Sequence, residues 1–294
     1  MPNTNISRPK VACEVSVERV VAARAADKLA ALESATAQTL PAGALVPGLQ
    51  QANLAARQPI VDALRDSLSM VAGRSRDVVL IIPDATTRIM LLDFDTLPEK
   101  PQDAEGVVRF RLKKSLPFDI DESAVSFDRQ ATGDGLRVIA AVTPRAVLEE
   151  YESAVRDAGY HPGSVVPSMI AALGAVDATH PAMVIKVESG TTTFAVVDRG
   201  QLLLYRALEN GGATVTGESL VDDVNTSLVY FEDRYQVTVE RLLTSGVQSG
   251  QALQAAFSDR AVKVEDLVSA SLAGAAASNV SRSALAGVAG ALVS

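Results

Sequence analysis

The stretch with the clearest potential for chemistry runs from Val184 to Gly212, where apolar strands are joined by short polar turns. Glycine lets backbone N–H groups approach an anion, threonine hydroxyls donate hydrogen bonds, and a carboxylate can orient Mg²⁺ through water. The candidate site residues of this stretch are Glu188, Gly190, Thr191, Thr192, Thr193, Gly211 and Gly212. The pattern predicts a phosphate-binding hairpin. The alternative is a structural turn, in which glycine serves the backbone and threonine serves the strand.

Composition excludes several other kinds of site. The formal net charge of −8 argues against a nucleic-acid partner, which needs a basic face. Cys13 is the only cysteine, so no internal disulfide is expected, and the spacing of His161 and His180 indicates no metal site. Asp84, at a strand–turn junction, is the one candidate for the general base of a sugar kinase. The polar N-terminus and the lack of a long apolar run predict neither a signal peptide nor a membrane span, and favour a cytoplasmic setting.

Hydrophobic periodicity predicts alternating strands and helices around these residues. Strands are expected over 11–23 (a pair), about 29–36, 78–94 (a pair buried on both faces), 124–142 (a pair), 182–212 and 240–246. Helices are expected over 55–72, from about 104 to before Pro117, 144–159, 169–178, after Gly212 as far as Tyr235, 251–257 and 283–294.

A weak internal repeat suggests how these elements are arranged. The residues Cys13 to Val17 resemble Val187 to Thr191, since each copy ends an apolar strand with Glu and continues through a small-residue turn into a new strand. Two such lobes facing each other make a cleft, as in the actin, sugar-kinase and Hsp70 class. That resemblance implies an α/β, actin-like, two-lobed fold. It also implies that a third loop, residues 244–250 with Gly246, would pack on adenosine.

A more specific resemblance comes from residues 110–128, FRLKKSLPFDIDESAVSFD, together with the Asp198-Arg199-Gly200 turn and the long helix after Gly212. Their order is similar to that of the type IV pilus assembly protein PilM family, relatives of the division protein FtsA, over nearly the whole chain. The resemblance implies a small inserted subdomain that follows the Pro-rich break at 97–103. The expected division is a first lobe of residues 1–96 and 161–181, an inserted subdomain of 97–160 and a second lobe of 182–294.

The first hairpin departs from the pattern of that family, which reads Asp-Ile-Gly, then small residues, then Lys. Glu14 and Ser16 stand at the Asp and Gly positions, Val21 stands at the Lys position, and Glu18 adds an acid where phosphate would lie. The resemblance therefore implies a cleft for ATP and Mg²⁺ whose binding is weak or lost.

The function implied is that of a cytoplasmic scaffold of a type IV pilus or related secretion machine, peripheral at the inner face of the cell membrane. Its partner would be the N-terminal cytoplasmic peptide of a PilN-like inner-membrane protein, held between the inserted subdomain and the first lobe. The candidate partner-binding residues are Arg109, Lys113, Leu116 and Phe118. Two alternatives stay open, an active actin-like ATPase or sugar kinase and the cytoplasmic domain of a type II secretion L-type protein. Homo-oligomer formation also stays open.

Overall fold

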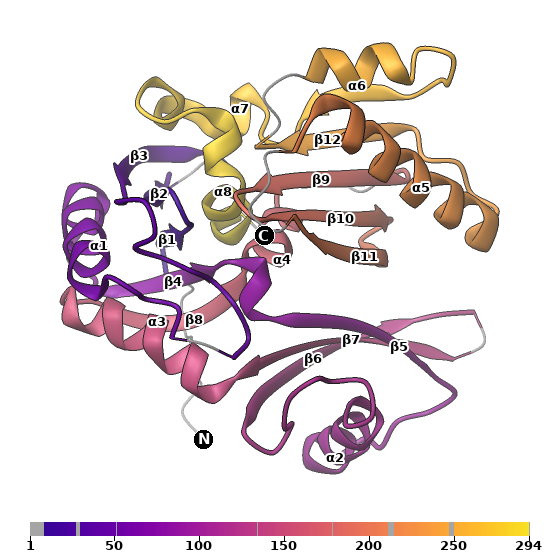
Figure 1. Cartoon of the computed structure of the whole chain (residues 1–294), viewed down its shortest axis with the longest axis horizontal. Coiled ribbons are helices and arrows are strands. Elements are labelled where there is room, and N and C mark those ends of the chain that lie inside the picture. The colour runs from indigo at the N-terminus through magenta and orange to yellow at the C-terminus, as the bar shows by residue number, and fades with distance from the viewer. Residues whose placement is uncertain are drawn as a thin grey trace.

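The structure is a computed structural model that describes residues 9–27, 30–50, 52–133, 135–177, 179–210, 215–246 and 250–293. It contains two five-stranded sheets and one three-stranded sheet (Figure 1). No helix in these ranges combines the length and the apolar character needed to cross a bilayer.

The first sheet has the strand order β3-β2-β1-β4-β8. β1 pairs antiparallel with β2 and parallel with β4, which in turn pairs parallel with β8. Helices α1 and α3 cover one face of this sheet, while α4 and α8 cover the other. The bounds are β1 (Val11–Val15), β2 (Arg19–Ala25), β3 (Leu32–Thr39), β4 (Asp77–Ile82), β8 (His161–Pro167), α1 (Arg57–Val71), α3 (Arg145–Asp157), α4 (Ser168–Leu173) and α8 (Ala286–Val293).

The second sheet repeats this order as β11-β10-β9-β12-β13, with α5 and α6 on its outer face. In both sheets the first three strands form an antiparallel meander and two parallel strands extend it on the other side. The internal repeat expected from the two Glu-bearing hairpins is therefore confirmed. The bounds are β9 (Ala182–Glu188), β10 (Thr191–Asp198), β11 (Gln201–Glu209), β12 (Arg241–Ser245), β13 (Lys263–Asp266), α5 (Gly217–Tyr235), α6 (Gly250–Ala256) and α7 (Ala270–Ala273), with 3-10 turns at Gly274–Ser278 and Arg282–Leu285.

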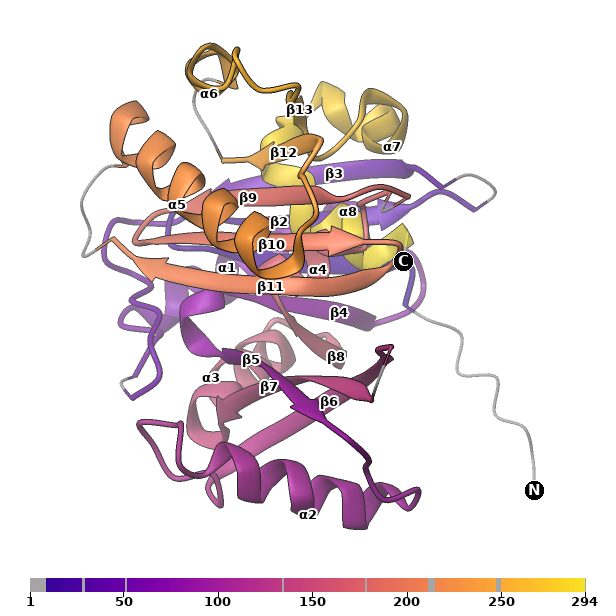
Figure 2. The same cartoon turned by 90° about the vertical axis from the view of Figure 1, so that its right-hand side faces the viewer.

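The third sheet has the order β5-β7-β6 and carries α2 on one face (Figure 2). Its bounds are β5 (Arg88–Phe94), β6 (Ser123–Ala131), β7 (Leu136–Pro144) and α2 (Pro101–Leu112). The strand–turn–strand predicted over 78–94 is confirmed, but the prediction that its strands are buried on both faces is wrong for β5, which is only half-buried and belongs to a different sheet from β4. A 3-10 turn, Asp84–Thr86, carries the chain from one sheet to the other.

The positions of two elements differ from the predicted division of the chain. The three-stranded sheet begins at Arg88, ahead of residue 97, and α3 packs in the first-lobe core through Tyr151 and Val155. The division of the chain at 97, 161 and 182 stays a prediction.

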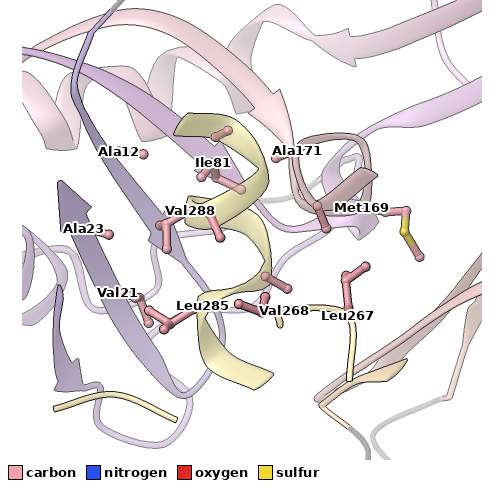
Figure 3. Close-up of a cluster of buried hydrophobic side chains, with 14 of the residues drawn as sticks. Ala12, Val21, Ala23, Ile81, Met169, Ala171, Leu267, Val268, Leu285 and Val288 are labelled. Carbon is pink, nitrogen blue, oxygen red and sulfur yellow. The ribbon is translucent and has the colours of Figure 1, made fainter. Parts of the chain in front are cut away.

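Helix α8 lies between the two large sheets, where Figure 3 shows Leu285 and Val288 facing Val21 and Ile81 of the first sheet. The small residues of this helix permit a close approach, since a Cβ on Gly290 would stand 2.0 Å from the carbonyl oxygen of Ala171 in α4. The predicted small-residue helix packed against a sheet is confirmed. It makes one continuous apolar core out of the facing sides of both lobes.

Candidate functional site

A cavity of about 580 Å³ lies where the two Glu-bearing hairpins face each other. The turn between β1 and β2 forms one wall and the turn between β9 and β10 the other. The start of α5, the end of β12, α6 and the 3-10 turn before α8 complete the lining. Such a volume is in the range of small-molecule sites. The charged residues that line it, among those described, are Glu14, Glu18, Arg19, Lys186 and Glu188.

The first hairpin closes in a tight turn that uses its own hydrogen-bond donors. The backbone N–H and the hydroxyl of Ser16 both donate to the carbonyl oxygen of Arg19, at 2.9 and 3.0 Å. At the tip, Arg19 is paired with Glu18 at 2.9 Å. Val21 is buried in the core behind the hairpin. The donors of Ser16 and the guanidinium of Arg19 are therefore already paired within this turn.

A buried charge cluster forms the floor of the cavity. The ammonium of Lys186, in β9, lies 3.3 Å from Glu14 Oε1 of the opposite lobe and is also bonded to Glu188 on its own strand. Ser168, at the start of α4, is hydrogen-bonded to Glu14 and lies 3.3 Å from Glu188 Oε1. Burial alone would lower the pKa of Lys186, but the attraction of Glu188, Glu14 and Asp84 holds it above its ordinary value. The lysine is charged at neutral pH.

Asp84 lies behind this floor and does not line the cavity. It is 2% exposed and accepts hydrogen bonds from the backbone N–H of Met169 at 2.8 Å and from Thr193 Oγ1 at 3.0 Å. Burial and the nearby Glu188 raise its pKa to about 7. A general base must reach the proton that it removes, and these contacts hold Asp84 away from a substrate in the cavity.

The threonines of the second hairpin are committed to internal contacts. Thr192 accepts a hydrogen bond from Asn210 Nδ2 at 3.0 Å, while Thr193 donates to Asp84, and both are buried. Thr191 is also buried, opposite Glu188 in the β9–β10 ladder. Gly190 turns the hairpin with a φ of 89°. The structure thus brings Glu188 to the cavity but keeps the three threonines in the sheet.

Gly246, in the loop expected to pack on adenosine, has a structural reason to be glycine. Its φ is 74°, and a Cβ there would stand 1.9 Å from the carbonyl oxygen of Val187 in β9. Gly211 and Gly212 lie outside the described residues. The beginning of α5 also faces the cavity, but the N–H of Ser219 is already bonded to Thr216 Oγ1 at 3.2 Å.

The residues of this cavity do not fit a magnesium–nucleotide complex. Each lining cation among the described residues is already paired with a carboxylate, and the acids outnumber the cations. A triphosphate would add negative charge to this wall, where unpaired Lys or Arg would be needed. No group of three or more His, Cys, Asp and Glu residues in the described ranges is arranged to hold a metal ion.

The four candidate partner-binding residues lie on and after α2. Arg109 is used inside the subdomain, where it bonds Glu105 at 2.8 Å and the carbonyl oxygen of Ile120 at 2.8 Å. Lys113 is exposed and pairs with Asp121 at 3.2 Å, while Leu116 and Phe118 are half-buried against the subdomain core. The most exposed large apolar side chain of α2 is instead Phe110, which is 74% exposed, against 38% for Val107.

Sequence reasoning missed Lys186, the central residue of the floor. A signal was present, because a lone lysine inside an apolar strand must find a partner, and Glu188 lies two residues further on the same face of that strand. Ser168 carried no comparable signal, since its role depends on how α4 is placed between the lobes.

Comparisons with known proteins place this architecture among solved structures. No protein-family model and no curated protein sequence matches the chain. A chain of a PilM–PilN type IV pilus biogenesis complex is similar with a TM-score of 0.76 and 16% identity, covering 97% of each chain. The cytoplasmic domain of EpsL, an inner-membrane component of the type II secretion system of Vibrio cholerae, is similar with a TM-score of 0.52 and 11% identity, over 89% of this chain and 98% of that one.

A protein with an actin-like ATPase fold from Bacteroides thetaiotaomicron is similar with a TM-score of 0.51 and 10% identity, over 87% of this chain and 90% of that one. At these identities the likeness concerns the fold. The expected fold class is confirmed, and the chain has the two-lobed actin-like ATPase fold in the form found in the PilM–PilN complex.

Proposed function

We propose that the protein is a PilM-like scaffold that binds the N-terminal cytoplasmic peptide of a PilN-like inner-membrane protein. One observation carries the proposal, namely the likeness to a chain of the PilM–PilN complex across 97% of both chains. On this proposal the protein is cytoplasmic, peripheral at the inner face of the membrane, and serves a type IV pilus or a related secretion machine.

The charges of the cavity support a scaffold over an enzyme. An actin-like ATPase would need cations and amides directed at phosphate, yet Arg19 and Lys186 are paired and the Ser16 amide is used within its own turn. A sugar kinase would also need a general base in contact with its substrate, and Asp84 lies behind the floor. The likeness to EpsL is weaker than that to the PilM–PilN complex and leaves a type II secretion role as the second candidate.

The proposed peptide site lies between the inserted subdomain and the first lobe, along β6. This strand is the terminal strand of its sheet, on the side where α3 packs. An extended peptide can add to such an edge through main-chain hydrogen bonds and place alternate side chains in apolar contacts. The peptide path would be lined by Lys113, Leu116 and Phe118, which precede β6. Arg109 would support this segment through its bond to the carbonyl oxygen of Ile120. Phe110 adds an exposed apolar anchor on α2.

The test is calorimetric titration of the purified chain with a synthetic N-terminal peptide of the PilN-like protein from the same organism. We expect micromolar affinity, about −8 kcal/mol, because a few buried anchors suffice for that. Phe110→Ser should weaken binding roughly tenfold, as expected for loss of an apolar anchor. Met70→Ser is the matched control, since Met70 is a similarly exposed apolar side chain on α1 of the first lobe. It should bind the peptide as the unaltered protein does.

A second titration with ATP, with and without Mg²⁺, separates the scaffold from the enzyme. The scaffold proposal expects no steady turnover and binding much weaker than that of the peptide. Steady ATP hydrolysis that is abolished by Glu188→Ala would contradict the proposal and favour the ATPase. Equal loss of peptide binding in the Phe110 and Met70 variants would show that the subdomain site is wrongly placed.

A further inference from the structure

The floor of the cleft contains a cluster of oppositely charged side chains that come from both lobes. Glu14 comes from the first hairpin, and Lys186 and Glu188 come from the second, so the lysine joins carboxylates of two lobes. All three side chains are buried or nearly so, at 8%, 5% and 17% exposure respectively. Two carboxylates this close in a dry environment repel each other unless a cation or a proton lies between them.

Divalent metals commonly neutralise such facing carboxylates in proteins, because hard cations prefer carboxylate oxygens. Here the positive charge is instead attached covalently to β9. The lysine is 4% exposed and is held in its charged form by the surrounding acids.

The surroundings of the cluster leave little space for a metal beside the lysine. On one side, Ser168 is bonded to Glu14 and lies near Glu188. On another, α8 comes so close that a Cβ on Gly287 would stand 2.4 Å from Glu14 Oε2. The Oε1 atoms of Glu14 and Glu188 therefore already contact an ammonium and a hydroxyl, and the backbone of a helix lies against Oε2 of Glu14.

We propose that Lys186 is a built-in cation that takes the place of a divalent metal at the floor of the cleft. The attraction that holds the two carboxylates together, and the contact that it makes between the lobes, then need neither metal nor nucleotide. This inference concerns the cleft and does not depend on which partner the protein binds.

The experiment compares thermal unfolding in millimolar MgCl₂ and in NaCl of equal ionic strength, so that metal binding is separated from screening. The unaltered protein should unfold at the same temperature in both salts. Lys186→Met keeps the length of the side chain but leaves two buried acids unpaired, and should lower the midpoint in NaCl by roughly 10 °C. Mg²⁺ should recover part of that loss, since the vacated position is then a carboxylate pair. Lys263→Met, which removes an exposed lysine of β13, should show neither effect.

A triple variant, Lys186→Met with Glu14→Gln and Glu188→Gln, covers the case in which the single variant does not fold. A folded triple variant whose unfolding midpoint is the same in MgCl₂ and NaCl supports the proposal, because no unpaired charge is left in the cluster. A triple variant that also fails to fold overturns it, since the lysine would then be needed for its shape. Stabilisation of the unaltered protein by Mg²⁺ over NaCl overturns it as well. Two further outcomes overturn the proposal. One is an unfolding midpoint of Lys186→Met equal to that of the Lys263→Met control, and the other is a lowered Lys186→Met midpoint that does not rise in Mg²⁺.

Discussion

Asp84 shows how a buried carboxyl can connect the lobes while making stability depend on pH. It comes from the turn after β4, accepts a hydrogen bond from Thr193 of β10, and faces Glu188, Lys186 and Tyr205. Burial and Glu188 raise its pKa to about 7, while Lys186 and the hydrogen bonds oppose the rise. Burial and the same acids hold the pKa of Tyr205 above its ordinary value, so the tyrosine stays neutral.

The sign of the pH effect follows from this raised pKa. The folded protein holds the Asp84 proton up to about pH 7, whereas the unfolded chain releases it near 3.8. Stability is therefore fully present below the lower value and is lost as pH rises through the higher one. Asp84→Asn should remove that loss. The free energy of unfolding of the variant, relative to that of the unaltered protein, should therefore increase by on the order of 2 kcal/mol from pH 5 to pH 8. Urea unfolding at both pH values measures this difference.

The matched control for that measurement is Asp66→Asn, an exposed carboxyl on α1. Its stability relative to the unaltered protein should be the same at both pH values. A pH-independent difference for Asp84→Asn would mean that the Asp84 carboxyl is ionised throughout this range, contrary to the raised pKa.

At the residue scale, the sequence predicts the two acids of the cleft but not the cation between them. Glu14 and Glu188 were recognisable because each ends an apolar strand before a small-residue turn. Lys186 belongs to the same strand as Glu188, but its significance depends on Glu14, which lies 172 positions away in the chain. The threonines were misleading for the same reason, since their inward partners, Asp84 and Asn210, are set by strand register rather than by the local pattern.

At the scale of elements, the junction between α4 and α8 is limited by backbone contact. Because a Cβ on Gly290 would stand 2.0 Å from the carbonyl oxygen of Ala171, Gly290→Ala must push the two helices apart. Overpacking of this kind typically costs about 1–3 kcal/mol of unfolding free energy. Gly106 is the matched control, a glycine inside α2 with nothing within 4 Å of its added Cβ. Gly106→Ala should instead stabilise by up to about 1 kcal/mol, through helix propensity alone.

Denaturant unfolding of both glycine variants tests whether α8 is an integral part of the core. A stable Gly290→Ala variant would mean that α8 can shift without loss, and that the two lobes are less tightly joined than the packing in Figure 3 indicates.

Most elements were predictable from periodicity, but the predicted burial of both strands over 78–94 is wrong for β5. Both strands are apolar, and the pattern of one strand alone does not say which sheet it joins. The difference lies in their partners: β4 is buried between α1 and α8, whereas β5 turns Met90, Leu92 and Phe94 toward α2. Such a division depends on long-range pairing with β7, which a local sequence pattern does not contain.

At the scale of the whole molecule, two joints of different strength hold the three sheets together. The two large sheets share one continuous apolar core around α4 and α8, reinforced by the Lys186 cluster. The three-stranded sheet adds Leu91 and Ile139 to the edge of that core. Its other ties to the second lobe include the Arg88–Glu209 pair at 3.3 Å and the Gln201 bond to the carbonyl oxygen of Ala131 at 2.9 Å. Because exposed polar ties contribute little, the subdomain should open at a lower free energy than the lobes.

Tyr235, at the end of α5, links the second lobe to the three-stranded sheet and can test whether the subdomain opens more easily than the lobes. Its hydroxyl accepts a hydrogen bond from Arg137 Nη1 of β7 at 3.0 Å and donates to the carbonyl oxygen of Leu203 at 2.8 Å. Tyr235→Phe removes both bonds and leaves the buried guanidinium one partner short, which should cost about 1–2 kcal/mol locally. The rate of backbone amide hydrogen exchange should then increase in β5 and β7, while the amides of β1 and β9 keep their protection. Tyr230→Phe, on the exposed side of the same helix, should change neither. Equal quickening in all four strands would show that the subdomain and the lobes open as one unit.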